Sequence, residues 1–343
     1  MVYQLILPMG IFVTVLLLGV PLGIWVAGLR AQEGAVDAAT LVIVLVLAFS
    51  LYAPILAMIG VMELTRMAEA SFTRIRRLLD TEPMALPREP TTPQSTTLTF
   101  EGVDFAYVPN QPVLQDISFT VPPKTMTAIV GPSGSGKSTV LNLIPRFWDV
   151  AAGRVTLGGQ DLRDLDEQTL SNHITMVFQD VYLFAGSIAD NIRMGQPEAD
   201  DTAVQNAARQ AQAHDFIMAL PDSYDTQVGE GGASLSGGEA QRLSIARAIL
   251  KDAPIVLLDE ATAAIDPTTE RALQQAFARL VENKTLIVVA HKLSTIEAAD
   301  QILVLSDGKI AERGNHATLI QQNGIYAGLW QQRKQAQSRQ ISA

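Results

Sequence analysis

Two long uncharged runs open the chain, at residues 2–29 and 41–62. The hydrocarbon core of a bilayer needs roughly 20 apolar residues of helix, so each run is long enough to span it. Helices of a protein core rarely stay uncharged over such a length, so the pattern favours two membrane helices over two buried core helices. A secretory signal peptide is disfavoured, because no Lys or Arg precedes the first run and because the run is too long.

After the second run, apolar residues recur at helical spacing with charges between them, so this helix is predicted to continue into water. The apolar positions are Leu64, Met67, Ala68, Phe72, Ile75, Leu78 and Leu79. The connection at 30–40 holds one basic and two acidic residues, whereas four arginines follow the second run within residues 66–77. Positive charge concentrates on the cytoplasmic side, so we expect the connection outside and everything after Met62 inside.

Residues 81–97 carry four prolines among Thr, Ser and Gln, which is typical of a linker. The predicted organisation is a partial transmembrane domain at 1–80, the linker at 81–97 and a second domain at 98–343, in which short apolar runs and polar segments alternate as in an α/β protein.

The composition narrows the function classes. A chain of 343 residues is long enough for two domains, each with a core. Its net charge of −10 argues against a basic nucleic-acid-binding domain, so no nucleic-acid partner is expected. It has no cysteine, which excludes disulfides, Cys-based zinc sites and thiol nucleophiles.

A Gly-rich loop follows the apolar run at 125–130, a predicted buried strand, and its spacing G-x-x-x-x-G-K-S is typical of a phosphate-binding loop. The glycines let backbone N–H groups wrap the phosphates, and the start of the following helix adds partial positive charge. Lys137 is expected to reach the β- and γ-phosphates of ATP, and Ser138 to bind Mg²⁺. The predicted nucleotide contacts in this loop are Gly131, Ser133, Gly134, Ser135, Gly136, Lys137, Ser138 and Thr139.

A second predicted strand, at 255–258, ends in Asp259 and Glu260. Open α/β sheets bind ligands at the carboxyl ends of their strands. Asp259 is therefore the candidate to hold Mg²⁺, directly or through water, and Glu260 is the candidate to orient and deprotonate the attacking water. By itself, an apolar run that ends in two acidic residues is weak evidence for a catalytic site. Together with Lys137 of the phosphate-binding loop, it becomes strong evidence.

A second Gly-rich loop, Leu-Ser-Gly-Gly-Glu at 235–239, precedes a predicted helix at 237–250. Ser236, Gly237 and Gly238 thus lie at a helix start, which is another anion site. Because the first loop already cradles one triphosphate, the second site suggests a contact from another subunit; the alternative is an ordinary serine N-cap.

Residues from about 98 to 335 resemble the nucleotide-binding domain of an ABC transporter, and LSGGE at 235–239 resembles the signature motif of that family. The resemblance implies an α/β P-loop NTPase domain with a helical subdomain, here preceded by two transmembrane helices. Two such domains close head to tail, so Ser236, Gly237 and Gly238 contact ATP held by the partner's copy of Lys137.

The resemblance also implies roles for four further residues. Tyr107 stacks on adenine, which base–aromatic stacking explains. Gln179 senses Mg²⁺ and touches the membrane domain, Asp266 communicates across the dimer, and His291 lies at the γ-phosphate. The catalytic residues are then Glu260, His291, Lys137 and Gln179, and the metal-binding residues are Ser138, Gln179 and Asp259. Two positions depart from the family pattern, where Ala263 replaces a common Ser and Gly231 replaces an Arg of many exporters.

The order of membrane helices, linker and ATPase resembles exporter-type half-transporters, as do the segments 180–184 and 188–192. That subgroup normally has six membrane helices, and the two here match the last two. Either the chain is a truncated version of a longer product, or another polypeptide supplies four helices. A weaker resemblance is to members linked to metal–siderophore uptake.

We therefore expect an ATP- and Mg²⁺-dependent transporter subunit in the plasma (inner) membrane, with its ATPase domain in the cytoplasm. Its expected partners are a second ABC subunit, the lipid bilayer and an unidentified solute. The alternatives are a membrane-anchored mechanochemical ATPase that acts on a partner protein, and a non-hydrolysing assembly or regulatory fragment. A P-loop kinase is disfavoured, because it has no use for LSGGE or His291.

Overall fold

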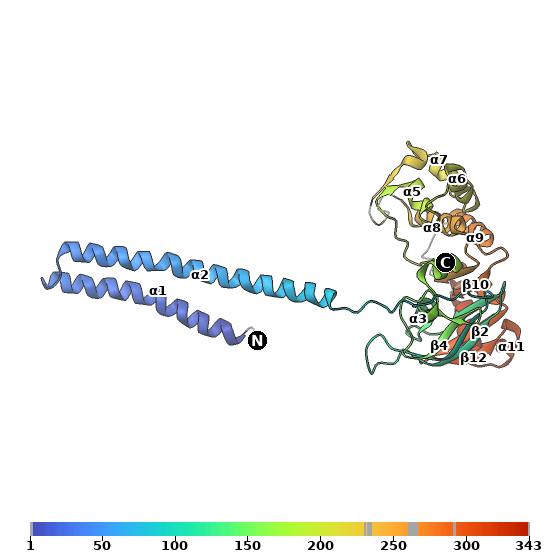
Figure 1. Cartoon of the computed structure of the whole chain (residues 1–343), viewed down its shortest axis with the longest axis horizontal. Coiled ribbons are helices and arrows are strands. Elements are labelled where there is room, and N and C mark those ends of the chain that lie inside the picture. Colours follow the sequence, from blue (N-terminus) through green and yellow to red (C-terminus); the bar gives the residue numbers. More distant parts are fainter. Residues whose placement is uncertain (1–2, 230, 232–234, 260–266, 291–292, 342–343) are drawn as a thin grey trace. The chain divides into compact units, whose positions relative to one another are not determined.

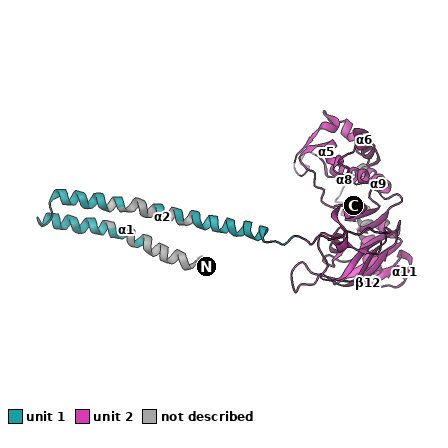
Figure 2. Ribbon diagram, viewed as in Figure 1, with its two compact units in different colours: residues 1–83 teal, residues 84–343 magenta. Residues whose placement is uncertain are grey.

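The computed structural model describes residues 3–229, 231, 235–259, 267–290 and 293–341. The chain divides into two compact units, Met1–Pro83 and Met84–Ala343 (Figure 2).

The first unit is a helical hairpin of α1 (Tyr3–Gln32) and α2 (Ala38–Leu79) (Figure 1). The connection is shorter than the predicted 30–40, because α1 continues past Arg30 and because Asp37 caps α2 by accepting a hydrogen bond from the Thr40 amide at 3.3 Å. Among the described residues, neither of these helices contains a stretch both long and apolar enough to span a bilayer, so the two predicted spans are not confirmed.

The second unit is built on a six-stranded sheet in the order β12-β11-β3-β10-β9-β6. Five strands are parallel and β12 is antiparallel. The predicted strands at 125–130 and 255–258 are β3 and β9, each correct to within one residue. The six strands are β3 (Met126–Val130), β6 (Ile174–Val177), β9 (Ile255–Asp259), β10 (Thr285–Val289), β11 (Gln301–Ser306) and β12 (Lys309–Gly314).

Both faces of this sheet are buried, which explains why its strands read as near-continuous apolar runs. Along β9, Ile255 and Leu257 pack into one hydrophobic cluster, whereas Val256 and Leu258 pack into the other, together with Leu243 of α8. The alternation follows from successive side chains of a strand pointing to opposite faces.

An antiparallel sheet in the order β2-β1-β4-β5 closes the first of these clusters. Phe100 of β1 pairs in register with Phe119 of β2, and their rings stack with centroids 4.5 Å apart. The strands are β1 (Leu98–Phe105), β2 (Leu114–Val121), β4 (Ala152–Leu157) and β5 (Gln160–Asp161), and a separate pair is β7 (Gly186–Ser187) with β8 (Gln227–Val228).

Helices α5 to α8 gather at one end of this unit, away from β2, β4 and β12 (Figure 1). The helix predicted at 237–250 is α8. The helices are α3 (Lys137–Leu143), α4 (Glu167–His173), α5 (Ile188–Arg193), α6 (Asp201–Gln210), α7 (His214–Met218), α8 (Gly237–Lys251), α9 (Pro267–Leu280), α10 (Leu293–Glu297), α11 (His316–Gln321) and α12 (Ile325–Ile341), with 3₁₀ turns η1 (Leu162–Asp164) and η2 (Ser223–Asp225).

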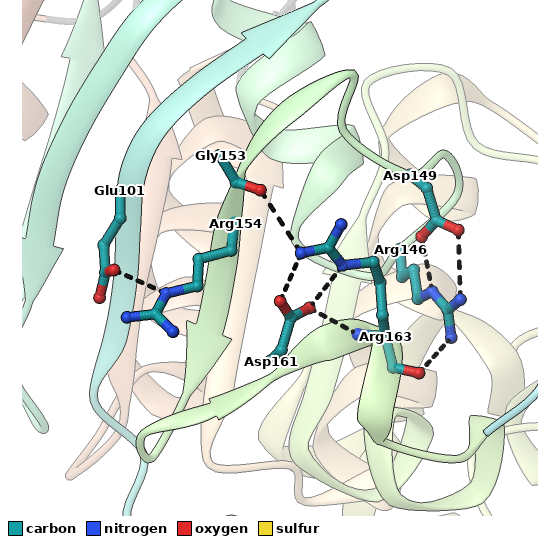
Figure 3. Close-up of polar contacts among 7 residues, drawn as sticks. All are labelled: Glu101, Arg146, Asp149, Gly153, Arg154, Asp161 and Arg163. Carbon is teal, nitrogen blue, oxygen red and sulfur yellow. Dashed lines mark hydrogen bonds and ion pairs between the residues drawn. The ribbon is translucent and has the colours of Figure 1, made fainter. Parts of the chain in front are cut away.

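A network of arginines fixes the segment that follows α3 (Figure 3). The Arg146 guanidinium, nearly buried, binds both carboxylate oxygens of Asp149, at 2.7 and 3.2 Å, and also reaches the carbonyl of Arg163. Arg163 in turn pairs with Asp161 at 2.6 Å. Because Arg146 also donates to the carbonyl of Ala85 at 2.9 Å, the Pro-rich segment is tied to the end of α3.

The central strand β10 supplies a stability prediction. Ile287 is fully buried and lies in register between Thr127 and Leu257. Ile287→Ala should lower the free energy of unfolding by about 2–4 kcal/mol, through lost transfer energy and the cavity left behind. Urea unfolding followed by tryptophan fluorescence measures it. Met218→Ala, at a side chain 53% exposed, is the matched control, and equal unfolding midpoints for the two variants would contradict the packing described.

Candidate nucleotide-binding site

The candidate site residues that the structure describes follow the carboxyl ends of parallel strands. β3 runs into the loop that begins at Gly131, β9 ends at Asp259, and Gln179 follows β6 by two residues. β10 lies between β3 and β9 and leads to Ala290. Because the carboxyl ends of parallel strands share one edge of a sheet, the topology brings these residues to a common edge.

The Gly-rich loop depends on backbone shapes that favour glycine. Gly131, Gly134 and Gly136 have φ of +153°, +79° and +97°. A Cβ at Gly131 would lie 2.2 Å from the carbonyl oxygen of Leu305, and one at Gly136 would lie 2.6 Å from Cδ2 of Leu114. The loop can therefore pass this close to its neighbours only without side chains at these two positions.

Lys137, the first residue of α3, has an electrostatically costly position. Its side chain is buried, and its ammonium donates a hydrogen bond to the carbonyl of Pro132 at 2.8 Å. Burial lowers the pKa of Lys137, the charge of Arg333 lowers it further, and Asp259 raises it. A bound phosphate would offset this cost, because an anion beside a buried ammonium favours its charged form.

The hydroxyl of Ser135 is a second group on this loop that suits a polar ligand. Its oxygen is buried and has no hydrogen-bond partner within the described part of the chain. Buried polar atoms normally have hydrogen-bond partners, and a phosphate oxygen that approaches this loop could accept a hydrogen bond from this hydroxyl. Ser133, Gly134 and Ser138 are exposed on the same loop and are open to a ligand.

Tyr107 presents an aromatic ring near the start of α3. Its hydroxyl donates to Oγ1 of Thr139 at 3.3 Å, which is a weak bond. Phe105 and Trp148 contact it edge-on, with ring centroids 4.8 and 5.1 Å away, while 45% of Tyr107 stays exposed. The arrangement steadies the ring and leaves room for a stacked base. Sequence reasoning missed Trp148, although the aromatic pair at 147–148 was a signal.

The LSGGE segment begins α8, as predicted. Ser236 is its N-cap and forms a capping box with Glu239, so the reading as an ordinary serine N-cap is correct for the side chain. Gly237 is exposed, and a Cβ there would meet nothing within 4 Å. The start of this 15-residue helix thus stays open to an anion.

Several predicted residues lie outside the described part of the chain. They are Glu260, Ala263, Asp266 and His291. Gln179 is exposed and Asp259 is half-buried. Among the described residues, no three His, Cys, Asp or Glu side chains gather as a metal site. The available donors, Ser138 and Asp259, match the few protein ligands that Mg²⁺ uses when nucleotide phosphates supply the others.

Comparison with known proteins gives the family. Residues 114–263 match the family model "ABC transporter". The chain carries the ATP-binding domain of an ABC transporter.

Two curated relatives and one solved structure show how far the similarity extends. The chain is 48% identical over 272 residues to ATP-binding cassette sub-family B member 6 of Homo sapiens, which is 78% of this chain and 32% of that protein. It is 50% identical over 245 residues to the mycobactin import ATP-binding/permease protein IrtA of Mycobacterium tuberculosis, 71% of this chain and 28% of that one. A bacterial Atm1-family ABC exporter with ATP bound matches with a TM-score of 0.71 and 37% identity, over 93% of this chain and 56% of that chain.

Replacement of Gly131 and of Gly134 by alanine should reduce nucleotide affinity to different extents. Gly131→Ala places a methyl group against the Leu305 carbonyl and should reduce affinity for a fluorescent ATP analogue at least about tenfold. Gly134→Ala adds a methyl group where nothing lies within 4 Å, so only the cost of its positive φ remains and the loss should be smaller. Equilibrium titration measures both, and equal losses would contradict the close approach at Gly131.

Proposed function

We propose that this chain is the ATP-hydrolysing subunit of an ABC transporter, in which ATP-driven dimerisation moves a solute across a membrane. The observation that carries the proposal is the site around Lys137, a buried ammonium that follows a Gly-rich loop, with Asp259 at the end of β9 on the same edge of the sheet. Because the domain belongs to a family of transporters, we propose that its ATP hydrolysis is coupled to transport.

The proposed roles follow the chemistry of phosphoryl transfer. Lys137 and the loop amides hold the phosphates, while Mg²⁺ is held by Ser138, Gln179 and Asp259. Glu260 orients and deprotonates the attacking water, and His291 contacts the γ-phosphate. Tyr107 stacks on the adenine.

Each ATP site is proposed to be shared between two subunits. Ser236, Gly237 and Gly238 then bind the phosphates held by Lys137 of the partner subunit. The open helix start at Gly237 supports this arrangement, because backbone N–H groups at a helix start favour anions. Whether the partner is a second copy or a related subunit is left to the complementation experiment below.

The membrane part of the proposal rests on the uncharged runs within α1 and α2. We propose that both helices cross the plasma (inner) membrane and that residues 98–343 lie in the cytoplasm, joined to the partial transmembrane domain 1–80 by the linker 81–97. The ABC exporter structure matches over 93% of this chain, more than the ATPase domain alone, which supports this division.

The proteins to which this chain is similar indicate which substrate class and transport direction to test. One is named for mycobactin import. Because the sequence also resembles members linked to metal–siderophore uptake, a metal–siderophore complex is the substrate class that we propose to test first. The similar solved structure is that of an exporter. The direction of substrate movement in vesicles therefore tests import against export.

Hydrolysis is tested at the proposed general base. Glu260→Gln removes the basic carboxylate but keeps the size of the side chain, and it should reduce vanadate-sensitive ATPase activity at least about a hundredfold. ATP binding should persist, because the change leaves the loop at 131–139 intact. Glu270→Gln, at a position on α9, is the matched control. Undiminished activity of Glu260→Gln would remove the catalytic assignment.

The shared site predicts complementation between two inactive variants. Lys137→Ala and Gly237→Asp should each abolish hydrolysis, one by losing the phosphate ammonium and the other by placing a carboxylate at the start of α8. A mixed dimer of the two variants has one site with neither change and should recover up to about half of the wild-type ATPase rate. Mixing two preparations of the same variant is the control. No recovery in confirmed mixed dimers would contradict the head-to-tail arrangement.

A further inference from the structure

We propose that Arg333 of α12 is a positioning residue of the ATP site, which holds Ala290, the residue after β10, against the strand that leads into the phosphate-binding loop. The inference rests on the proposed function and deepens it, because it adds the carboxyl-terminal helix to the nucleotide site.

Two consecutive hydrogen bonds connect α12 to the edge of the sheet that carries the site. Nη1 of Arg333 donates to the carbonyl of Ala290 at 3.2 Å. The amide of Ala290 donates to the carbonyl of Ile129 at 3.2 Å. Ala290 directly precedes His291, which lies outside the described residues, and Ile129 lies two residues before Gly131. Arg333 thus supports the ends of two strands that lead into proposed phosphate-binding segments.

The first turns of α12 fix where Arg333 points. Tyr326, Trp330 and Arg333 follow the spacing i, i+4, i+7, so they share one face of the helix. Tyr326 is 2% exposed, and its hydroxyl lies 2.7 Å from Nδ1 of His316. The Trp330 ring packs on His316 with centroids 4.5 Å apart, and the Glu312 carboxylate accepts from the Tyr326 amide at 3.0 Å. The helix is therefore anchored before it reaches Arg333.

Arg333 also packs directly beside the phosphate-binding strand. Together with Val130, the last residue of β3, it lines a cavity of only about 10 Å³. The other lining residues are Ile296, Tyr326, Leu329 and Trp330. A cavity of this size is near the lower limit for one water molecule, so the helix and the strand are closely packed. A change in the position of Arg333 should therefore also shift Val130 and the loop that follows.

The guanidinium adds positive charge to the phosphate site without touching ATP in this proposal. Arg333 lines the small cavity together with Val130, one residue before the phosphate-binding loop, so its positive charge lies close to the start of that loop. A triphosphate brings one more phosphate than a diphosphate into this positive potential. Arg333 should therefore favour ATP over ADP, as well as hold Ala290 in position.

The test uses the full chain, purified in lipid nanodiscs, and measures equilibrium binding of a non-hydrolysable ATP analogue and of ADP. Arg333→Gln should reduce affinity for the ATP analogue about tenfold and affinity for ADP less than about threefold. Arg333→Lys keeps the charge and should restore most of the preference for the triphosphate. Arg313→Gln removes the same charge from exposed Arg313 of β12 and should change neither affinity.

Three results would overturn the inference. One is an unchanged ratio of the two affinities in folded Arg333→Gln, and another is an equal change in Arg313→Gln. The third concerns Arg333→Lys, which is needed if Arg333→Gln strongly lowers the thermal unfolding midpoint. If Arg333→Lys restores stability but not the preference for the triphosphate, Arg333 has only a structural role. A wild-type chain that binds neither nucleotide would instead overturn the proposed function, and the role of Arg333 with it.

Discussion

The pairing of three parallel strands is the constraint on which the site depends. Ile129 of β3 pairs with Val289 of β10, which pairs with Asp259 of β9. This register places the start of the phosphate-binding loop, Ala290 and the acidic strand end at one level of the sheet. Burial on both faces fixes the register, because a slip by one residue would turn each apolar side chain toward the wrong cluster. The site is therefore a consequence of core packing rather than of loop structure alone.

The charges at this edge of the sheet determine how a bound anion would change the stability of the domain. The edge carries a buried ammonium at Lys137, a nearby guanidinium at Arg333, and Asp259 as a counter-charge. Without an anion, the two cations repel each other in a region of reduced screening. In the proposed site, a bound nucleotide would relieve this repulsion and would give the buried hydroxyl of Ser135 a partner. Binding energy is thus coupled to the local stability of the loop, so nucleotide should stabilise the folded domain.

The sequence predicts this site only as far as its signals are local. The loop at 131–139 and the strands β3 and β9 are contiguous patterns, so their positions could be predicted closely. Trp148 and Arg333 were missed, because their importance arises from contacts with Tyr107 and Ala290, distant in sequence and brought near only by the fold. The antiparallel sheet was missed for the same reason, since its pairing, such as Phe100 with Phe119, depends on tertiary contacts.

The start of α8 shows why a cap and a ligand site can coincide. Ser236 uses its side chain to satisfy the amide of Glu239, so the helix is stable without any ligand. The amides of Gly237 and Gly238 have no hydrogen-bond partner within the described residues, as expected for the first turn of a helix. Gly237 is exposed and has no side chain, so a phosphate can approach its amide closely, whereas Gly238 is buried. If that phosphate belongs to a nucleotide on the partner subunit, nucleotide binding and dimerisation are thermodynamically coupled. Each must then strengthen the other.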